Sequence, residues 1–474
     1  MRYIYLTAAV ALPLWLAGCA TPLSPPPVAA TAPPQWYAPL PHHGALTDLT
    51  RWWQQFNDPL LVQLIESAQT SSPTVASARA RIGQARANAI AARAALLPTL
   101  DAQASASRGN AQPPAPLATT LQAGLQAGWE IDLFDANAKA SQGAGARLES
   151  AQAGWHDARV SVAAETAVSY VNLRTCERQL AVTVNDTQSR AETARLSDLT
   201  ARAGFTAPAT AALARASAAE ASARATQQRA QCDIEVKALV ALSGWPEPQL
   251  RQRLLAPWQE PAQSPLLPIV SLPAQLLAQR PDVYRAEREV AAASAEVGSA
   301  QAQRYPRLTL SGSIAAGMVH TGGASTNLQT WSIGPVAVTL PLFDGGRRAA
   351  NIEAAGARYD EAVALYTDRV RQAVREVERA LVNLESARLR MEDARTASEG
   401  YRASFVATEA RYRSGLGSLV ELEDARRTAL AAETALVTLQ RERLAAWISL
   451  YRAAGGGWAR PDLPSEWHRW NANR

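Results

Sequence analysis

The residues LPLFDGGR, Leu340 to Arg347, separate two different hydrophobic patterns. Before them, Val336, Val338 and Leu340 alternate with small or polar residues, which is the period of a β-strand. After them, apolar residues recur in steps of three, four and seven, as in a coiled-coil helix: Ile352, Tyr359, Val363, Tyr366, Val370, Val374, Val377, Leu381 and Leu384. With Asp344 as the helix cap, the junction predicts a strand that leads into a helix of about 65 residues, roughly 100 Å long.

The same junction occurs once more, in the first half of the chain. Leu133-Phe134-Asp135 corresponds to Leu342-Phe343-Asp344 at an offset of 209 residues. Two prolines and two glycines match in the same order at offsets of 208 to 211: Pro73 with Pro281, Pro98 with Pro306, Gly204 with Gly415, and Gly244 with Gly455. We therefore expect an internally duplicated chain. Each copy should contain a helix, two strands, a very long helix, a turn and a second helix.

The predicted strands come in two pairs. Leu308 and Leu310 alternate with polar residues in the second copy, and Leu121, Ala123 and Leu125 do so in the first. Each strand has about the 9–11 residues that cross a bilayer. The connections 108–117 and 318–328, which are rich in Gly, Pro and Asn, are predicted to be loops. Ordinary soluble hairpins would show the same alternation, so both interpretations stand at this point.

Lipid would impose a condition on these strands. No stretch after the N-terminal region has the ~20 consecutive apolar residues of a membrane-spanning helix. A four-stranded open sheet cannot lie in lipid, because its edges would leave unpaired backbone groups. If the chain crosses a membrane, the strands of several copies must close one barrel.

The N-terminus resembles that of a bacterial lipoprotein. Met1-Arg2 is basic, Leu6 to Leu16 is apolar, and Leu16-Ala17-Gly18-Cys19 ends the segment with small residues. The resemblance implies cleavage before Cys19, diacylglycerol on its sulfur and an acyl chain, such as palmitate, on its new amine. Ala20 follows in place of the Asp that favours retention in the inner membrane, which points to the outer membrane. The alternative is an ordinary signal peptide with a chance cysteine.

These patterns divide the chain into six parts. They are a lipoprotein signal peptide at 1–18, a lipid-anchored Pro-rich tether at 19–47, a first repeat at 48–245, a linker at 246–270, a second repeat at 271–457 and a C-terminal tail at 458–474. The first repeat has predicted strands at about 99–108 and 119–132 and a helical hairpin at 136–243. The second has strands at about 307–317 and 329–341 and a helical hairpin at 345–454.

Composition and motifs exclude several classes of function. The net charge is +5, but the arginines are scattered along helix faces, so nucleic-acid binding is not expected. The motifs HExxH, GxSxG and GxxxxGK[ST] are missing, the 5 His are dispersed, and Lys139 and Lys237 are the only lysines. We expect no enzyme, no metal site and no cofactor other than the covalent lipid.

Several motifs resemble those of the TolC-like outer-membrane factors, in particular the NodT-type lipoprotein branch, over nearly the whole mature chain. They are Trp52 to Pro59 (WWQQFNDP), Arg280-Pro281-Asp282-Val283, Tyr305-Pro306, Leu340 to Arg347 and Tyr412-Arg413-Ser414-Gly415. The resemblance implies a mainly α-helical homotrimer with a twelve-stranded β-barrel in the outer membrane and an α-helical barrel in the periplasm. It also implies two partners, a periplasmic adaptor and an inner-membrane transporter.

The turns between long helices are the predicted periplasmic tips. They lie at Gly204 and at Gly415-Leu416-Gly417, where glycine supplies backbone freedom. Glu421 and Asp424 follow on one helix face, and in the resembled family acidic residues at these positions surround the closed aperture. Glu421 is equally placed to complete a capping box with Ser418, and Asp424 to pair with Arg427.

The two remaining cysteines are equally spaced about the first tip. Cys176 lies 28 residues before Gly204 and Cys232 lies 28 residues after it. Helices that run antiparallel from that turn bring both thiols to one height, about 40 Å from the tip. In the oxidising periplasm a disulfide is expected. Buried free thiols or metal ligands are the alternatives.

The sequence thus predicts a passive outlet duct for small molecules such as drugs, fed by a transporter that is proton-driven in the branch resembled. Two alternatives remain: an outlet for secreted protein, and a periplasmic structural or adaptor coiled coil. The cargo itself is not encoded in any motif, because an outlet receives whatever its pump delivers.

Overall fold

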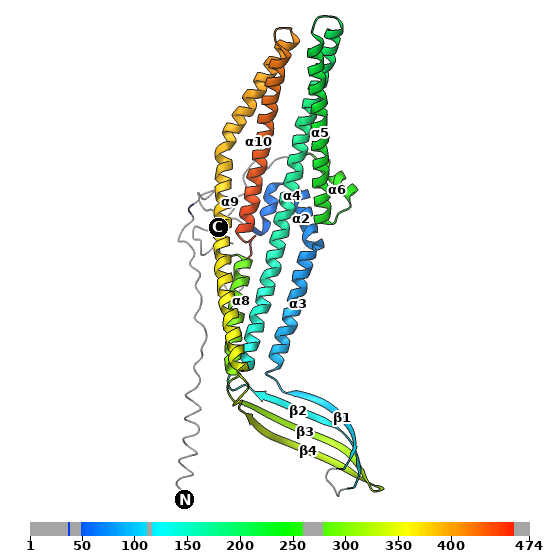
Figure 1. The fold of residues 1–474 in the computed structure, drawn as a ribbon, viewed down its shortest axis with the longest axis vertical. Coiled ribbons are helices and arrows are strands. Elements are labelled where there is room, and N and C mark those ends of the chain that lie inside the picture. The colour runs from blue at the N-terminus through cyan, green and yellow to red at the C-terminus, as the bar shows by residue number, and fades with distance from the viewer. Residues whose placement is uncertain (1–36, 38–48, 111–115, 259–276, 278, 459–474) are drawn as a thin grey trace. The chain divides into compact units, whose positions relative to one another are not determined.

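The computed structural model describes residues 37, 49–110, 116–258, 277 and 279–458. Cys19, the predicted tether apart from Tyr37, and residues 459–474 lie outside this part of the chain. The chain folds into two compact units, each assembled from both halves of the sequence (Figure 1). The strand unit includes residues 80–153 and 285–368, and the hairpin unit includes residues 154–284 and 369–458 together with the segment before residue 80. None of the described helices has the length and hydropathy to cross a membrane.

The strand unit contains one antiparallel sheet in the order β1-β2-β3-β4 (Figure 1). The strands are β1 (Thr99–Gly109), β2 (Ala118–Ile131), β3 (Arg307–Thr321) and β4 (Ala324–Thr339). The first two agree with the predicted bounds to within one residue. β2 pairs with β3 over the full length of β2, from Ala118 opposite Thr321 to Ile131 opposite Leu308. This pairing joins the two halves of the duplicated chain.

The alternation of side chains gives the sheet two unlike faces. One face is apolar, and its large side chains are exposed: Leu100, Leu121, Leu125, Trp129, Ile314, Met318, Trp331, Ile333, Val336 and Val338. The opposite face is polar, as in the row of paired residues Asp101, Gln126, Ser313 and Ser332. An exposed apolar face opposite a polar one is the arrangement of a barrel strand between lipid and water.

The predicted loop at 318–328 is wrong. β3 continues to Thr321 and β4 begins at Ala324, and Met318 pairs with Asn327 near the end of the ladder. Gly322 and Gly323 alone form the turn, with φ values of +57° and +89°. A two-residue turn of this kind requires positive φ at both positions, which glycine adopts without strain. The Gly and Asn content that suggested a long loop serves a tight hairpin.

Four helices of the strand unit stand in the same order as the strands (Figure 1). They are α3 (Pro73–Ala94), α4 (Ala136–Arg202), α8 (Pro281–Ala302) and α9 (Arg347–Arg413). In the middle of the row, α4 packs against α8: the Ser150 hydroxyl donates to Glu289 at 2.6 Å and Arg147 pairs with Glu296 at 2.5 Å. The predicted cap is present at the start of α9, where the Asp344 carboxylate accepts the backbone N–H groups of Gly346 and Arg348.

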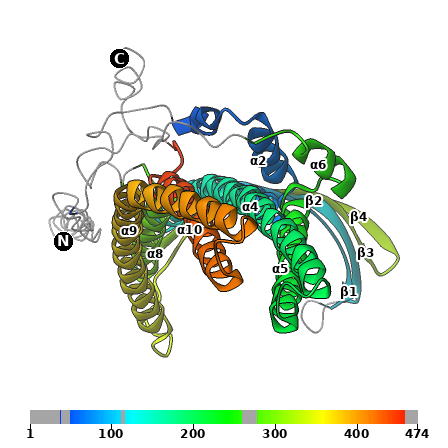
Figure 2. The same cartoon turned by 90° about the horizontal axis from the view of Figure 1, so that it is seen from above.

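The hairpin unit contains the two long helical hairpins. Helix α4 continues here and returns as α5 (Pro208–Ser243), and α9 returns as α10 (Leu419–Ala453). Figure 2 shows the two hairpins seen from above. The predicted coiled-coil seam of α9 is confirmed in this unit, because Val370, Val377, Leu381 and Leu384 are buried. Ala373, Ala380 and Ala387, also buried, repeat every seven residues beside the seam and let neighbouring helices approach closely.

A second set of shorter elements packs around the base of the hairpins. They are the 3-10 helix η2 (Leu49–Phe56), α2 (Pro59–Ser71) and α6 (Glu247–Leu254). The ring of Trp52, which is fully buried, stacks on Tyr451 with centroids 4.8 Å apart. Helix α6 lies within the predicted linker at 246–270, and its residues Leu250 and Leu254, one turn apart, are both buried. Burial of two leucines explains why this stretch is helical.

The motif Arg280-Pro281-Asp282 connects the start of α8 to the end of α10. The buried Arg280 guanidinium donates to the Ala453 carbonyl at 2.9 Å and pairs with Asp282 at 2.8 Å and Glu376 at 2.7 Å. It therefore satisfies one of the free carbonyls at a helix C-terminus. Although burial alone would raise the pKa of Asp282, the hydrogen bonds and charge of Arg280 hold that pKa below its usual value.

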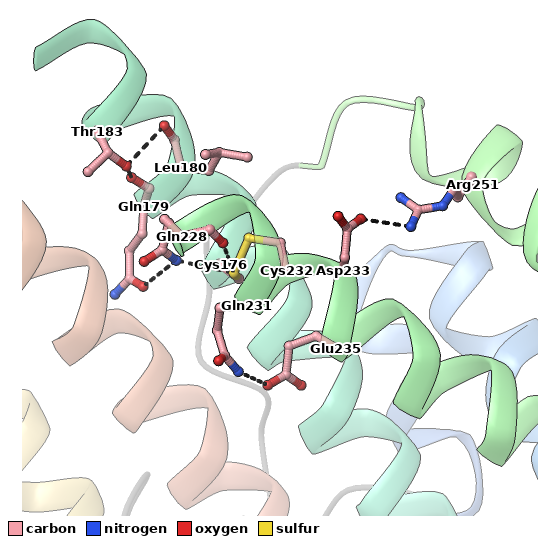
Figure 3. The surroundings of a disulfide bond; sticks show 10 residues. All are labelled: Cys176, Gln179, Leu180, Thr183, Gln228, Gln231, Cys232, Asp233, Glu235 and Arg251. Atoms are coloured by element: carbon pink, nitrogen blue, oxygen red, sulfur yellow. Dashed lines mark hydrogen bonds and ion pairs between the residues drawn. A yellow bond between two sulfur atoms is a disulfide. The ribbon is translucent and has the colours of Figure 1, made fainter. Parts of the chain in front are cut away.

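The structure contains the predicted disulfide between Cys176 of α4 and Cys232 of α5, with the two Cα atoms 5.5 Å apart. Figure 3 shows its surroundings on the two antiparallel helices, where Gln228 donates to Gln179 at 3.4 Å. Asp233, next to Cys232, pairs with Arg251 of α6 at 2.7 Å. The bond closes a loop of 56 residues that includes the whole tip of the first hairpin. Separation of α4 from α5 at this height is thus covalently prevented.

Gly317 permits close approach of β2 and β3, and we predict that Gly317→Ala weakens the sheet. A Cβ atom at this position would lie 2.3 Å from the Leu121 carbonyl oxygen, so the two strands would have to separate. The expected loss is about 1–3 kcal/mol of unfolding free energy, typical of overpacking. Thermal denaturation of the purified protein measures it. Gly128→Ala in β2 is the matched control, because its Cβ would meet nothing closer than Thr99 at 3.6 Å; equal losses in both variants would contradict the prediction.

Candidate functional site at the hairpin tips

Both long hairpins turn at a glycine in the left-handed region. Gly204 has φ +80° and Gly415 has φ +73°. In each case the next residue closes the helix end, since Phe205 donates its N–H to the Thr200 carbonyl and Leu416 does so to the Arg411 carbonyl, both at 2.9 Å. This six-residue closure is the Schellman motif, which requires a left-handed residue that glycine supplies. The predicted tip turns at Gly204 and Gly415 are therefore explained.

Gly417 has a different role from the one predicted. Its φ is not in the left-handed region, so it is not needed for backbone freedom. A Cβ atom here would lie 3.3 Å from the Tyr412 nitrogen and 3.4 Å from Glu421 Oε2. Gly417 provides space between the end of α9 and the start of α10.

Glu421 completes a capping box at the start of α10. Its carboxylate accepts the Ser418 N–H at 3.3 Å, and its own N–H donates to the Ser418 hydroxyl at 3.2 Å. The side chain is exposed, so capping leaves one carboxylate oxygen open to solvent. Both functions expected from the sequence, helix cap and acid at an aperture, are compatible with this geometry.

Asp424 lies one turn further along α10 and pairs with Arg427. Both side chains are exposed, at 65% for Asp424 and 77% for Arg427. An exposed pair contributes little to stability. Asp424 is thus placed on the surface of its own chain, where a neighbouring copy or a passing solute can reach it.

Below the tips lies a group of charges that was not predicted from the sequence. Arg190 of α4 pairs with Asp186 at 2.9 Å and with Glu423 of α10. Arg426 pairs with Glu423 at 2.8 Å and donates to the hydroxyls of α4 residues Ser189 and Thr193 at 2.9 and 3.1 Å. The group, which we call the tip network, consists of Asp186, Ser189, Arg190, Thr193, Ser217, Arg224, Glu409, Glu423 and Arg426.

The tip network joins one hairpin to the other. Glu423 accepts hydrogen bonds from Arg190 of α4, Ser217 of α5 and Arg426 of α10. The network has three guanidinium groups and three carboxylates, so its charges balance. Burial lowers the pKa of Arg426, which is 3% exposed, and the nearby Glu423 charge opposes that effect. Loss of one member would leave a buried charge without its partner.

The signal for this network was present in the sequence as helix spacing. Asp186 and Arg190 are four residues apart, and Glu423 and Arg426 are three apart, which are the spacings of paired helix neighbours. Such pairs are usually solvent-exposed, and only the packing of two hairpins shows that these are buried. Nearer the tips, the hydroxyls of Ser197 and Tyr412 lie 3.1 Å apart, beside a small apolar cluster that includes Leu419 and Leu422.

The sequence and fold match known proteins over nearly their full length. The model of the outer membrane efflux protein family matches residues 64–245 and 272–456. The pyoverdine export outer membrane protein OpmQ of Pseudomonas putida is 29% identical over 94% of this chain and 96% of its own. Nodulation protein T of Rhizobium leguminosarum bv. viciae is 28% identical over 97% and 95%, and outer membrane protein OprJ of Pseudomonas aeruginosa is 30% identical over 95% of each chain.

Solved channel structures have the same fold. The Campylobacter jejuni CmeC outer membrane channel has a TM-score of 0.82 at 23% identity, covering 95% of this chain and 98% of its own. The open state of the Neisseria gonorrhoeae MtrE outer membrane channel has a TM-score of 0.75 at 26% identity, covering 92% and 98%.

This chain belongs to the outer membrane efflux protein family. It is an efflux channel that spans the outer membrane and extends into the periplasm, as the resemblance in the sequence predicted. Channels of this kind are trimers in which a β-barrel continues into a helical barrel, and they function in pumps with an adaptor and an inner-membrane transporter.

Glu423 neutralises two buried guanidinium groups, so we predict that Glu423→Ala destabilises the hairpin unit. The expected loss is about 3–5 kcal/mol of unfolding free energy, because Arg190 and Arg426 would stay buried without their common partner. Thermal unfolding followed by circular dichroism measures it. Asp424→Ala, at the adjacent but exposed position, should unfold close to the wild-type temperature. A similar temperature for the two variants would show that the tip network contributes no more than a surface pair.

Proposed function

We propose that this chain is the homotrimeric outlet of a tripartite pump that exports small molecules from the cell. The observation that carries the proposal is the sheet, which has one apolar face, unpaired outer edges at β1 and β4, and two helices of 67 residues continuous with its strands. Four strands cannot close a barrel around a lumen, whereas three copies supply twelve. The helices are about 100 Å long, which suits a passage through the periplasm.

The channel itself supplies no energy for export. The sequence has no GxxxxGK[ST] motif for a nucleotide triphosphate, so transport energy has to come from a partner. We infer a periplasmic adaptor and an inner-membrane transporter of the proton-driven type as partners. A lipid on Cys19 would add a second attachment to the outer membrane beside the barrel.

Small molecules are the cargo class best supported by the relatives. Two are described as a pyoverdine export outer membrane protein and a toluene efflux pump outer membrane protein, at 29% and 27% identity. A protein-secretion outlet remains the alternative to be distinguished by experiment.

Deletion of the gene should make cells hypersensitive to at least one class in a panel of antibiotics, detergents, solvents, aromatic acids and metal salts. Growth inhibition assays measure the change, and the wild-type gene should restore resistance because it restores the outlet. Cys19→Ala is expected to restore it less well, since the chain would lose its lipid anchor. An unchanged panel combined with retention of a secreted protein inside the cell would refute small-molecule export and support the secretion alternative.

Asp424 is our candidate for the acid at the closed aperture, with Glu421 as a second contributor. Three copies would place charged pairs with Arg427 in a narrow neck, where carboxylates hold cations and restrict passage. We predict that Asp424→Ala raises the conductance of purified trimers in planar bilayers. Glu392→Ala is the matched control, because Glu392 forms the same kind of exposed pair with Arg395 on α9, far from the tip. Equal conductance of wild type and Asp424→Ala would remove Asp424 from the gate.

A further inference from the structure

The duplication predicts one helix–helix interface, or joint, that is not formed within the chain. Helices α3 and α8 are equivalent at an offset of 208 and have 22 residues each, and α4 and α9 are equivalent at an offset of 211 and have 67 residues each. The chain contains the joint of α8 with α4. Its equivalent, α3 with α9, is not formed, because α3 and α9 stand at opposite ends of the row (Figure 1).

The sheet places this missing joint between two copies. β1 and β4 are the outer strands, and β1 follows α3 while β4 precedes α9. In a closed barrel of several copies, β4 of one copy pairs with β1 of the next, and the alternation of strand direction makes that pair antiparallel. The helices attached to these strands, α9 and α3, are then brought together. This step depends on the proposed function, which requires closure of the barrel by several copies.

The existing joint shows which residues would meet. Between α4 and α8 lies a groove with a volume of about 370 Å³, lined by residues from both helices that include Gln142, Ala146, Glu149, Ser294 and Gly298. Adding 211 to the positions on α4 gives Glu353, Ala357 and Asp360 of α9. Subtracting 208 from the positions on α8 gives Arg86 and Ile90 of α3. All five of these equivalent residues are exposed in the part of the chain that the structure describes. Ile90 is exposed to 63% although it is a large apolar residue.

The equivalent residues on α3 and α9 have charges of opposite sign. Helix α3 contains four arginines and no acidic residue, whereas the exposed face of α9 contains Glu353, Asp360 and Glu361. None of these three carboxylates, nor Arg86, has a side-chain partner among the described residues. Glu353 and Asp360 are seven residues apart, roughly 10 Å along the helix, and the equivalents of Glu353, Asp360 and Arg86, which are Gln142, Glu149 and Ser294, line one groove. A second opposite pair, Arg81 and Glu361, occupies the positions of Glu289 and Ser150, which are hydrogen bonded in the existing joint.

We infer that Arg86 of one copy binds between Glu353 and Asp360 of the next copy, with Ile90 packed against the small side chain of Ala357. The corresponding groove within the chain has the neutral residues Gln142 and Ser294 in place of Glu353 and Arg86. The groove within the chain also contains Lys139 and the ion pair of Arg288 with Glu149, whose equivalents are Ala350, Ala80 and Asp360. The two joints therefore have their charges at different positions. Charge of opposite sign favours the correct pairing, and a mismatch leaves like charges together.

Charge reversal tests this assignment. Arg86→Glu would place three acids together, and we expect at least a fivefold lower fraction of trimer after mild detergent extraction, measured by native electrophoresis. Glu353→Arg with Asp360→Arg should give a similar loss, and all three changes in one chain should restore most of the trimer. Arg93→Glu is the matched control on the same helix, because its equivalent, Gln301, does not line the groove. An equal loss for Arg93→Glu would overturn the proposal and assign the arginines of α3 to another partner, such as lipid phosphates.

A cross-link provides a test that does not depend on stability. Arg86→Cys and Ala357→Cys in one chain should yield disulfide-linked dimers and trimers on non-reducing gels, whereas each single variant should not. Cys176 and Cys232 do not contribute, because they are bonded to each other. Absence of linked species refutes the joint. The wild-type gene is tested in the deletion strain in parallel. If it restores resistance while the cross-link fails, the proposed joint is wrong and the proposed function is retained. Failure to restore resistance counts against the proposed function.

Discussion

The backbone hydrogen bonds at the edges of the sheet are the constraint on which the rest of this molecule depends. Within lipid, an unpaired N–H or C=O group costs several kcal/mol, so a sheet with one lipid-facing side needs every edge paired. The chain pairs β2 with β3 itself and leaves β1 and β4 for neighbouring copies. Oligomerisation is therefore part of the fold, and helices α3 and α9 are positioned by the strands that continue them.

Duplication makes this arrangement economical. A joint that evolved once can serve inside the chain, between its two halves, and again between copies, provided that the two uses differ enough to avoid mispairing. The strands follow the same rule as the helices: β2 pairs with β3 within a copy, and the equivalent pairing of β4 with β1 joins two copies. The two halves differ in the disulfide of the first hairpin, which prevents separation of its two helices. The α4–α5 hairpin is covalently closed, whereas at the corresponding height α9 and α10 are joined by the ion pair of Arg390 with Glu442 and have no disulfide.

The tips combine a rigid base with small exposed ends. The buried tip network links both hairpins through Glu423, and beyond it lie the turns at Gly204 and Gly415 with exposed Phe205 and Leu416. A balanced buried network resists separation, because each charge would lose its partner. Motion at the entrance is consequently expected to be easiest beyond the network, where Glu421 is found; Asp424 lies beside Glu423, at the level of the network.

The sequence alone predicted the duplication, the long helices, the strand pairs and their order, and it favoured the pairing of Cys176 with Cys232. These features depend on local periodicity, on fixed rise per residue and on the glycines and prolines that end helices, all of which are written in the order of residues. Only the tertiary structure decided that residues 318–328 form a tight hairpin, that residues 247–254 form a helix, and that Asp186, Arg190, Glu423 and Arg426 are buried together. A charged residue on a helix has the same sequence pattern whether its face meets water or a second hairpin, so burial depends on which distant segments pack against it.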